Sequence, residues 1–334
     1  MALQVNGGEV EGSNSWQRLE FTRPQMGVPF RIVLYATDEA AAQQAVEAAY
    51  QRVSELNSIL SDYDPESEIN RFCHRIPVGT PAPVGSDFWL NLQRSQRLAR
   101  ETGGAFDVTV GPLVNLWRRA RRHRELPPPG LIEEARAAVG WHRLQLDARR
   151  RTVTMRVPGM RFDFGGIAKG YAADEALRVL KARGFPRALV AASGDVTVGE
   201  APPQADGWRV EVGPSGTQEN LAPPRVLQLH HRAVSTSGDL FQFVVIDGRK
   251  YSHIVDPKTG VGLVNQALVT VVARDGTTAD SLATAVSVLG AEEGLRLVER
   301  TRGVAAMIVE RNPAGGFASR ESRRWRREFG RSDR

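Results

Sequence analysis

The sequence has little cysteine, little lysine and no long apolar run. Cys73 is the only cysteine in 334 residues, which excludes an internal disulfide framework and a zinc site built from cysteines alone. No apolar stretch approaches the roughly 20 residues that cross a bilayer, so we expect no integral membrane span. Only four of the 44 basic residues are lysine. Hydrophobic residues make up 41% of the chain and charged residues 25%, as in an ordinary globular protein.

The net charge of +6 at pH 7 is compatible with nucleic acid, an anionic membrane surface or phosphorylated ligands. The positive charge is concentrated in residues 118–124 and in residues 320–334, where seven arginines stand against three acids. We interpret both runs as solvated charge. Because no recognisable binding motif or basic-aromatic stripe accompanies them, we expect no nucleic-acid partner.

The ends of the chain read as extensions of a globular core. Residues 1–19 are predicted to be a loose leader, residues 20–319 the folded part, with one or two subdomains, and residues 320–334 an Arg-rich tail. The N-terminus has no basic stretch followed by an apolar one, no cysteine for a lipid and no twin arginine. As written, the chain is expected in the cytoplasm. If an N-terminal signal is missing from it, the periplasm or a membrane surface is expected instead.

The hydrophobic pattern predicts helices interspersed with hairpins. Asp38 precedes an Ala-rich helical stretch that runs to about Leu60, and residues 118–130 are predicted to form a charged loop. Further helices are predicted over residues 86–102, 131–139, 167–183 and 278–299. Strands are predicted over residues 28–36, 160–164, 187–193, 208–212, 232–237 and 267–273, with hairpins at 143–157 and across Asp247-Gly248. Few units resemble a parallel crossover, so we expect an α+β fold with a mainly antiparallel sheet and packed helices.

A glycine turn before a helix is the first segment that could carry chemistry. Residues 163–170 read Asp-Phe-Gly-Gly-Ile-Ala-Lys-Gly, a predicted strand that enters a two-glycine turn and then a helix. Such a helix start suits a phosphate, because its backbone N–H groups and the helix dipole face the ligand. Lys169 would add a positive charge. The same pattern also occurs as a purely structural turn.

A carboxylate and a hydroxyl, one helical turn apart, form the second candidate. Asp280 and Thr284 are four residues apart, so both oxygens lie on one face of the predicted helix. Such oxygens suit Mg²⁺ or Ca²⁺ rather than zinc. The alternative is that Asp280 favours the helix dipole and that Thr284 is a small packing residue.

Three further side chains are candidates on weaker grounds. His253 is predicted on a strand beside the turn at residues 256–260, where an imidazole could carry protons near neutral pH. Asp107 follows a glycine pair and an aromatic residue, and it could accept a hydrogen bond from a heterocycle or cap a turn. Tyr63 in a turn-rich loop could stack on a planar ring or simply lie on the surface.

Taken together and in this order, these segments resemble the ApbE-type FAD:protein FMN transferase family. The resemblance runs from Met26-Gly27 to about residue 319, so it covers the predicted folded part, 20–319. It rests on the loop at 61–68, Gly-Gly-Ala-Phe-Asp at 103–107, the segment at 163–170, Ser-Gly-Asp at 193–195, Ser-His-Ile-Val-Asp-Pro-Lys-Thr-Gly at 252–260 and Ala-Asp-Ser-Leu-Ala-Thr-Ala at 279–285.

The resemblance implies the roles of twelve residues. FAD would be bound by Met26, Tyr63, Ala105, Phe106, Asp107, Asp163 and Lys169. Mg²⁺, or Mn²⁺ in its place, would be held by Asp280 and Thr284, with backbone oxygens of Gly166 and, as a further candidate, Thr277. His253 would assist the transfer. The implied reaction moves the FMN part of FAD to a threonine hydroxyl of a partner flavoprotein or membrane redox subunit, and AMP leaves.

Two other activities share parts of this site. A FAD pyrophosphatase would use the same residues, with water in place of threonine, to give FMN and AMP. A non-catalytic FAD-binding protein would need the flavin site but not the metal pair, so the presence of both Asp280 and Thr284 argues against it.

Overall fold

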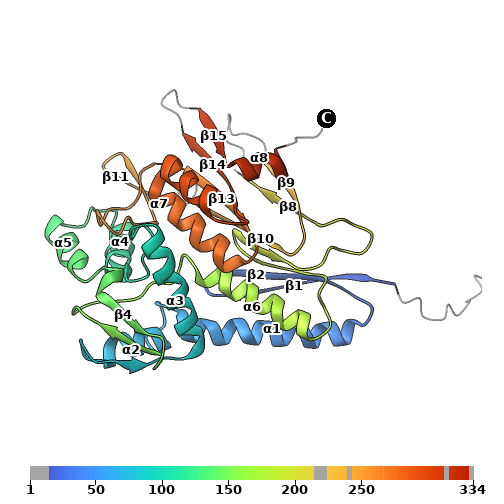
Figure 1. Cartoon of the computed structure of the whole chain (residues 1–334), viewed down its shortest axis with the longest axis horizontal. Helices are drawn as coiled ribbons and strands as arrows, with labels where there is room; N and C mark the ends of the chain where they lie inside the picture. Colours follow the sequence, from blue (N-terminus) through green and yellow to red (C-terminus); the bar gives the residue numbers. More distant parts are fainter. Residues whose placement is uncertain (1–14, 214–223, 239–242, 266, 312–315, 331–334) are drawn as a thin grey trace, which may run out of the picture.

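An eight-stranded sheet forms the centre of the computed structural model, which describes residues 15–213, 224–238, 243–265, 267–311 and 316–330 (Figure 1). All neighbouring strands in it are antiparallel. The spatial order is β1 (Gln17–Gln25), β2 (Val28–Ala36), β6 (Ala188–Ala192), β7 (Asp195–Val198), β10 (Arg232–Gly238), β13 (Ala267–Ala273), β14 (Ala305–Arg311) and β15 (Phe317–Glu321). The predicted α+β fold with a mainly antiparallel sheet is confirmed.

Three small antiparallel sheets lie around this centre. The hairpin predicted across Asp247-Gly248 is present, and the segment at 143–157 forms two strands of a three-stranded sheet. The pairs are β8 (Trp208–Val212) with β9 (Arg225–Leu229) and β11 (Phe243–Ile246) with β12 (Arg249–Ser252), and the three-stranded sheet has the order β3 (Ala82–Pro83), β5 (Thr152–Met155), β4 (Leu144–Asp147).

Of the eight helices among the described residues, those at Glu68–Arg75, Gly111–His123 and Arg323–Phe329 were not predicted, and the other five lie where the sequence predicts them. Asp38 caps the first of them by accepting a hydrogen bond from the backbone N–H of Ala41. In chain order they are α1 (Glu39–Leu60), α2 (Glu68–Arg75), α3 (Ser86–Glu101), α4 (Gly111–His123), α5 (Pro129–Ala137), α6 (Ala168–Ala182), α7 (Gly276–Arg300) and α8 (Arg323–Phe329), with a 3₁₀ turn at Trp141–Arg143. Among the described residues, no helix is both long and apolar enough to cross a membrane.

The central strands of the large sheet are buried on both faces, whereas its edge strands β1 and β15 are largely exposed. Helices α1, α6 and α7 cover one face, where Ile32 and Leu34 of β2 point (Figure 1). Val33, the residue between them, points to the other face and packs with Trp208 of β8 and Trp325 of α8. Alternate residues of a strand face opposite sides of a sheet, so two apolar layers require a nearly continuous apolar strand. The sequence of β2 satisfies this requirement.

Both predicted extensions of the chain are partly incorporated into this core, which corrects the expectation. Residues 17–19 of the predicted leader belong to β1 and pair with β2. The predicted tail, 320–334, contains the end of β15 and the whole of α8. Trp325 is fully buried there and stacks edge-on with Phe329, because these apolar residues share one face of the helix. Residues 1–14 and 331–334 lie outside the described residues.

Two further element predictions are wrong. Much of the loop predicted at 118–130 is helix α4, because Leu113, Trp117 and Ala120 recur at helical spacing and are buried while the neighbouring arginines lie outside. The strand predicted at 160–164 is absent apart from one bridge residue, Arg161. Phe162 of this segment is buried against the aromatic ring of Phe88, and it does not pair with a neighbouring strand.

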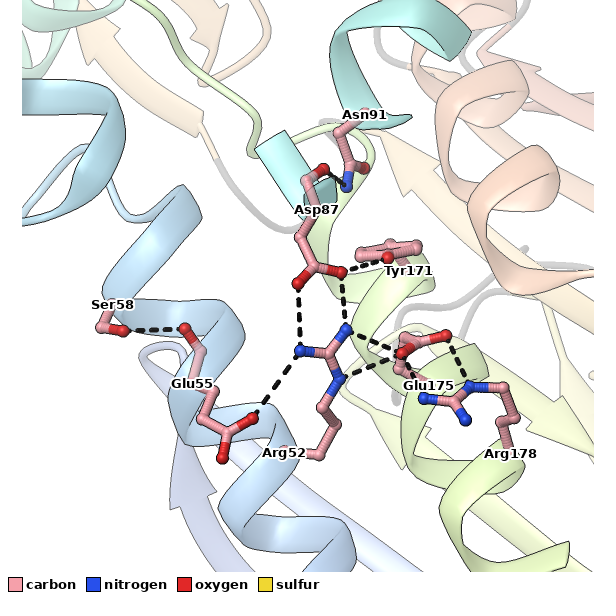
Figure 2. A network of polar contacts seen from close by, with 8 residues as sticks. All are labelled: Arg52, Glu55, Ser58, Asp87, Asn91, Tyr171, Glu175 and Arg178. Atoms are coloured by element: carbon pink, nitrogen blue, oxygen red, sulfur yellow. Dashed lines mark hydrogen bonds and ion pairs between the residues drawn. The ribbon is translucent and has the colours of Figure 1, made fainter. Parts of the chain in front are cut away.

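A half-buried arginine ties three of the helices together (Figure 2). Arg52 of α1 donates a bidentate pair of hydrogen bonds to Asp87 of α3 and further hydrogen bonds to Glu175 of α6 at 2.8 and 3.0 Å. Tyr171 also donates to Asp87, and Arg178 donates to Glu175. The network holds α6, which leads out of the glycine turn, against α1 and α3.

Replacing this arginine should destabilise the fold in a pH-dependent way. We expect Arg52→Met to lower the free energy of unfolding by about 2–3 kcal/mol at pH 7, because Asp87 loses its bidentate partner and Glu175 loses one of its two arginine partners. Burial raises the pKa of Asp87 and Glu175, but the hydrogen bonds outweigh it, so both pKa values lie below their usual range. Such groups stabilise the fold above the pKa of the unfolded chain and lose this contribution as the pH falls through the folded pKa.

Urea unfolding at pH 7 and at pH values below about 4 therefore tests the prediction. The gap in stability between Arg52→Met and the wild type should narrow at the lower pH. Arg178→Met is the comparison variant, because Arg178 is largely exposed and contacts Glu175 but not Asp87; its loss of stability should be smaller and should come from Glu175 alone. A gap that stayed constant with pH would assign the effect to packing of the arginine stem rather than to its charge.

Candidate active site

A cavity of about 890 Å³ lies beside the first turns of α6 and α7. Its size is in the range of small-molecule and cofactor pockets. Of the twelve residues predicted for the site, all except Thr277 line it, although they come from segments spread over the whole chain. The lining set is Met26, Tyr63, Ala105, Phe106, Asp107, Asp163, Gly166, Lys169, His253, Asp280 and Thr284.

A partly buried lysine and two buried carboxylates form a charged cluster beside the cavity. Nζ of Lys169 lies 3.1 Å from Oδ2 of Asp195 and 3.9 Å from Oδ2 of Asp280. Asp195 also accepts a hydrogen bond from the hydroxyl of Ser235, and Asp280 accepts one from the backbone N–H of Gly170 at 3.0 Å. One lysine thus faces two carboxylates, so the cluster keeps an excess of negative charge.

The pKa values of this cluster follow from its burial and composition. Burial and the nearby carboxylate of Asp195 raise the pKa of Asp280, and Lys169 only partly opposes them. Burial lowers the pKa of Lys169, but the carboxylates of Asp280 and Asp195 outweigh it and raise that pKa overall. Lys169 therefore stays protonated at neutral pH.

Asp280, Thr284 and Gly166 all line the cavity, and Thr284 closely contacts the backbone of Gly166. Thr284 lies one turn after Asp280 on α7 and faces the glycine turn before α6. A Cβ built on Gly166 would lie 2.8 Å from the hydroxyl of Thr284, so only glycine lets the backbone approach this closely. Carboxylate, hydroxyl and backbone carbonyl oxygens are the donors that hard divalent cations prefer. The excess negative charge of the cluster fits such a cation.

Thr277 does not reach the cavity. Its hydroxyl and its backbone N–H both donate to Asp174 of α6, and its carbonyl accepts a hydrogen bond from Ser281 at 2.8 Å. Asp174 also accepts from the backbone N–H of Gly276 at 2.6 Å. The residue therefore anchors the start of α7 to α6 and sets the place from which Asp280 projects.

Asp107 already has hydrogen-bond partners within the chain. One carboxylate oxygen accepts from the backbone N–H and the hydroxyl of Thr109, and the other accepts from the backbone N–H of Trp141 at 2.7 Å. Burial raises the pKa of Asp107, and these hydrogen bonds work in the opposite direction. Asp107 therefore caps a turn, which is one interpretation of the sequence, and it also lines the cavity, which the other interpretation requires.

His253 and Met26 occupy turns at the cavity. The strand predicted to contain His253 ends one residue earlier, at Ser252, so the histidine lies in a bend; this corrects the expected strand position. Ser252 accounts for the local geometry, because its hydroxyl accepts a hydrogen bond from the backbone N–H of Ile254. Met26 has a φ of 50° in the tight turn between β1 and β2, which brings it to the cavity wall.

The sequence model of the ApbE family matches residues 26–308. The chain belongs to the ApbE family.

Individual relatives and solved structures agree with this assignment. A Haemophilus influenzae protein named FAD:protein FMN transferase is 29% identical over 288 residues, which are 85% of this chain and 83% of that protein. A Salmonella typhimurium protein of the same name is 30% identical, over 87% of this chain and 83% of its own length. The apo crystal structure of Pseudomonas stutzeri flavinyl transferase ApbE matches with a TM-score of 0.82 and 31% identity, over 95% of this chain and 98% of that one.

Several charged residues of this ApbE-family cavity were missed from the sequence. Asp62 and Arg118 line it and pair with each other, and Arg121 lines it as well. Asp195 belongs to a motif that supports the family resemblance, but sequence alone assigned it no role. The helical spacing of Leu113, Trp117 and Ala120 was the one sequence signal that could have placed the adjacent Arg118 on a helix.

The described lining of the cavity carries five carboxylates against three cationic side chains. The carboxylates are those of Asp62, Asp64, Asp107, Asp163 and Asp280, and the cations are Arg118, Arg121 and Lys169. A pyrophosphate would be repelled by such a lining unless positive charge accompanied it. The charge balance is therefore a second observation that fits a bound cation.

Proposed function

We propose that this chain is a FAD:protein FMN transferase. The observation that carries the proposal is the single cavity that collects residues from six separate motifs of an ApbE-family sequence. The relatives that match most of the chain are named for this activity. FAD would lie against Met26, Tyr63, Ala105, Phe106, Asp107, Asp163 and Lys169, which all line the cavity.

In the proposed reaction a threonine hydroxyl of an acceptor protein attacks the phosphorus atom of the FMN half of FAD. A new P–O bond forms to threonine, the bond to the bridging oxygen of the pyrophosphate breaks, and AMP leaves with that oxygen. The hydroxyl proton passes to His253, which acts as the general base. Phosphoryl transfer depends mainly on positioning and charge neutralisation. Lys169 and the glycine turn at 165–166 supply both on this chain.

The proposed metal is Mg²⁺, with Mn²⁺ as the alternative. Asp280, Thr284 and the carbonyl oxygen of Gly166 would hold it, and the ion would offset the charge of the pyrophosphate. Thr277 is left out of this ligand set, because its contacts are with Asp174 and Ser281. The acceptor is proposed to be a flavoprotein or a membrane redox subunit that presents a threonine.

One mass-spectrometry experiment tests the function. The protein is incubated with FAD, Mg²⁺ and a threonine-containing peptide of a candidate acceptor, beside the same peptide with alanine in place of threonine. We expect the threonine peptide alone to gain the mass of FMN less one water, with an equal amount of AMP. FMN and AMP without a modified peptide, across a panel of acceptors, would make the protein a FAD pyrophosphatase. Intact FAD in every reaction would leave a FAD-binding protein.

A further inference from the structure

Arg118 connects three segments at the mouth of the cavity. It projects from α4, and its guanidinium donates one hydrogen bond to Asp62 and another to Oδ2 of Asp163 at 3.1 Å. The same guanidinium lies over the ring of Tyr63, with its central carbon 4.1 Å from the ring centroid. The planar fork of arginine can make these contacts together, whereas the ammonium of a lysine cannot.

Tyr63 depends on this contact for its placement. Its side chain is 75% exposed, although it lines the cavity. The backbone of its loop is fixed from the other side, since the side-chain amide of Asn70 donates to three carbonyls, including that of Asp64 at 2.7 Å. A fixed backbone still leaves an exposed ring free to change rotamer, and the guanidinium of Arg118 restricts it.

The second arm of Arg118 reaches the glycine turn. Asp163 uses its other oxygen, Oδ1, to accept a hydrogen bond from the backbone N–H of Gly165 at 2.7 Å. The conformation of that turn sets the position of Gly166, whose backbone meets Thr284. A single guanidinium thus links the ring of Tyr63 to the glycine turn, both of which line the cavity.

We propose that Arg118 is a positioning residue for the flavin nucleotide: it holds the ring of Tyr63 as a preformed stacking surface and fixes Asp163 at the glycine turn. The proposal rests on the proposed function, because the planar ligand is taken to be FAD. Holding the ring before binding reduces the conformational entropy that the ligand would otherwise have to overcome. Arg118 therefore contributes to affinity mainly through Tyr63 rather than through a contact of its own.

A double-mutant cycle on FAD affinity tests this role. The variants are Arg118→Met, Tyr63→Leu and their combination, and the readout is the Kd for FAD from quenching of flavin fluorescence. We expect Arg118→Met to weaken binding about fivefold to tenfold in the wild-type background, and by no more than about twofold when Tyr63 is already leucine. Arg118→Lys should behave like Arg118→Met, because it restores the charge but not the fork.

The matched control is Arg122→Met, which removes the same charge one turn further along α4, at an exposed residue outside the cavity lining. It should leave the Kd within twofold. An equal loss from Arg118→Met in both backgrounds would overturn the proposed contribution through Tyr63, and the loss would then come from Asp163 or from a direct contact of Arg118 with FAD. An Arg118→Met protein with wild-type Kd, or full rescue by Arg118→Lys, would also overturn it.

Hydrogen exchange in the absence of FAD separates this proposal from the proposed function. In Arg118→Met, the peptide that covers residues 163–166 should exchange faster, because the Gly165 N–H bonds to Asp163. Residues 61–67, held by Asn70, and peptides from α7 should keep their wild-type rates. Unchanged exchange at residues 163–166 would refute the positioning of Asp163 by Arg118 even if the protein transfers FMN. Faster exchange would support that role even if the wild type failed to modify any acceptor peptide.

Discussion

Asp280→Asn is expected to lower metal-dependent FMN transfer by at least about 100-fold while leaving FAD affinity within a few-fold. The amide keeps an oxygen that can accept the hydrogen bond from Gly170, so the local fold should persist. It loses the charge that would bind Mg²⁺, and even a residue that only supports a metal ligand typically contributes 10–100-fold. Initial rates at saturating FAD and varied Mg²⁺ would measure the loss.

Thermal unfolding gives an independent readout of the same substitution. In the wild type, Mg²⁺ or Mn²⁺ should raise the Tm relative to protein in a chelator, because the ion binds only the folded state. Asp280→Asn should abolish this shift. In the chelator the variant should unfold at the same or a higher Tm than the wild type, since Asp195 and Asp280 then no longer compete for the single charge of Lys169.

Asp275→Asn is the matched control for Asp280→Asn. Asp275 caps the same helix and accepts from the backbone N–H of Thr278, but it is partly exposed and does not line the cavity. Asparagine caps helices about as well as aspartate, so transfer, metal shift and stability should be close to wild type. A metal-induced Tm shift retained in Asp280→Asn would remove Asp280 from the ligand set.

The fold was predictable where a local pattern determines it. The apolar run of β2 and the capped helical stretch after Asp38 specify their elements without distant partners. The segment 160–164 shows the limit, because its aromatic residues alternate like a strand, yet no ladder partner lies beside it except at Arg161. The arginine runs were a second source of error. In α4 and α8 they surround the few apolar residues that form the buried face, so both segments were predicted as solvated charge and not as packed helices.

The candidate site was predictable in its motifs but not in the contacts between them. Asp280 and Thr284 share a helix, so their spacing indicated a common face. Arg118 bonds to Asp62 and Asp163, which lie 56 and 45 residues away in the sequence. Asp195 of β7 meets Lys169 of α6 only because this strand and this helix pack together. Such pairs depend on tertiary structure, and no local pattern records them.

His253→Ala is expected to slow transfer by about 10²–10⁴-fold, the usual contribution of a positioned general base. A threonine hydroxyl is a poor nucleophile at neutral pH, so a group in the cavity has to accept its proton. Three of the lining carboxylates are engaged elsewhere: Asp107 by Thr109 and Trp141, Asp163 by Arg118 and Gly165, and Asp280 by Gly170. Among the described residues that line the cavity, His253 is the one imidazole.

Single-turnover transfer at saturating FAD and peptide separates this role from binding. His253→Ala should keep the FAD Kd within about threefold and lose rate, whereas His230→Ala, which removes an exposed imidazole outside the cavity lining, should keep both. A His253→Ala rate within a few-fold of wild type would exclude the histidine as the base. The base would then have to be one of the lining carboxylates, and each of these already accepts a hydrogen bond, Asp62 from Arg118 and Asp64 from a backbone N–H among them. Burial raises the pKa of Asp62, which makes this carboxylate more basic than an ordinary aspartate.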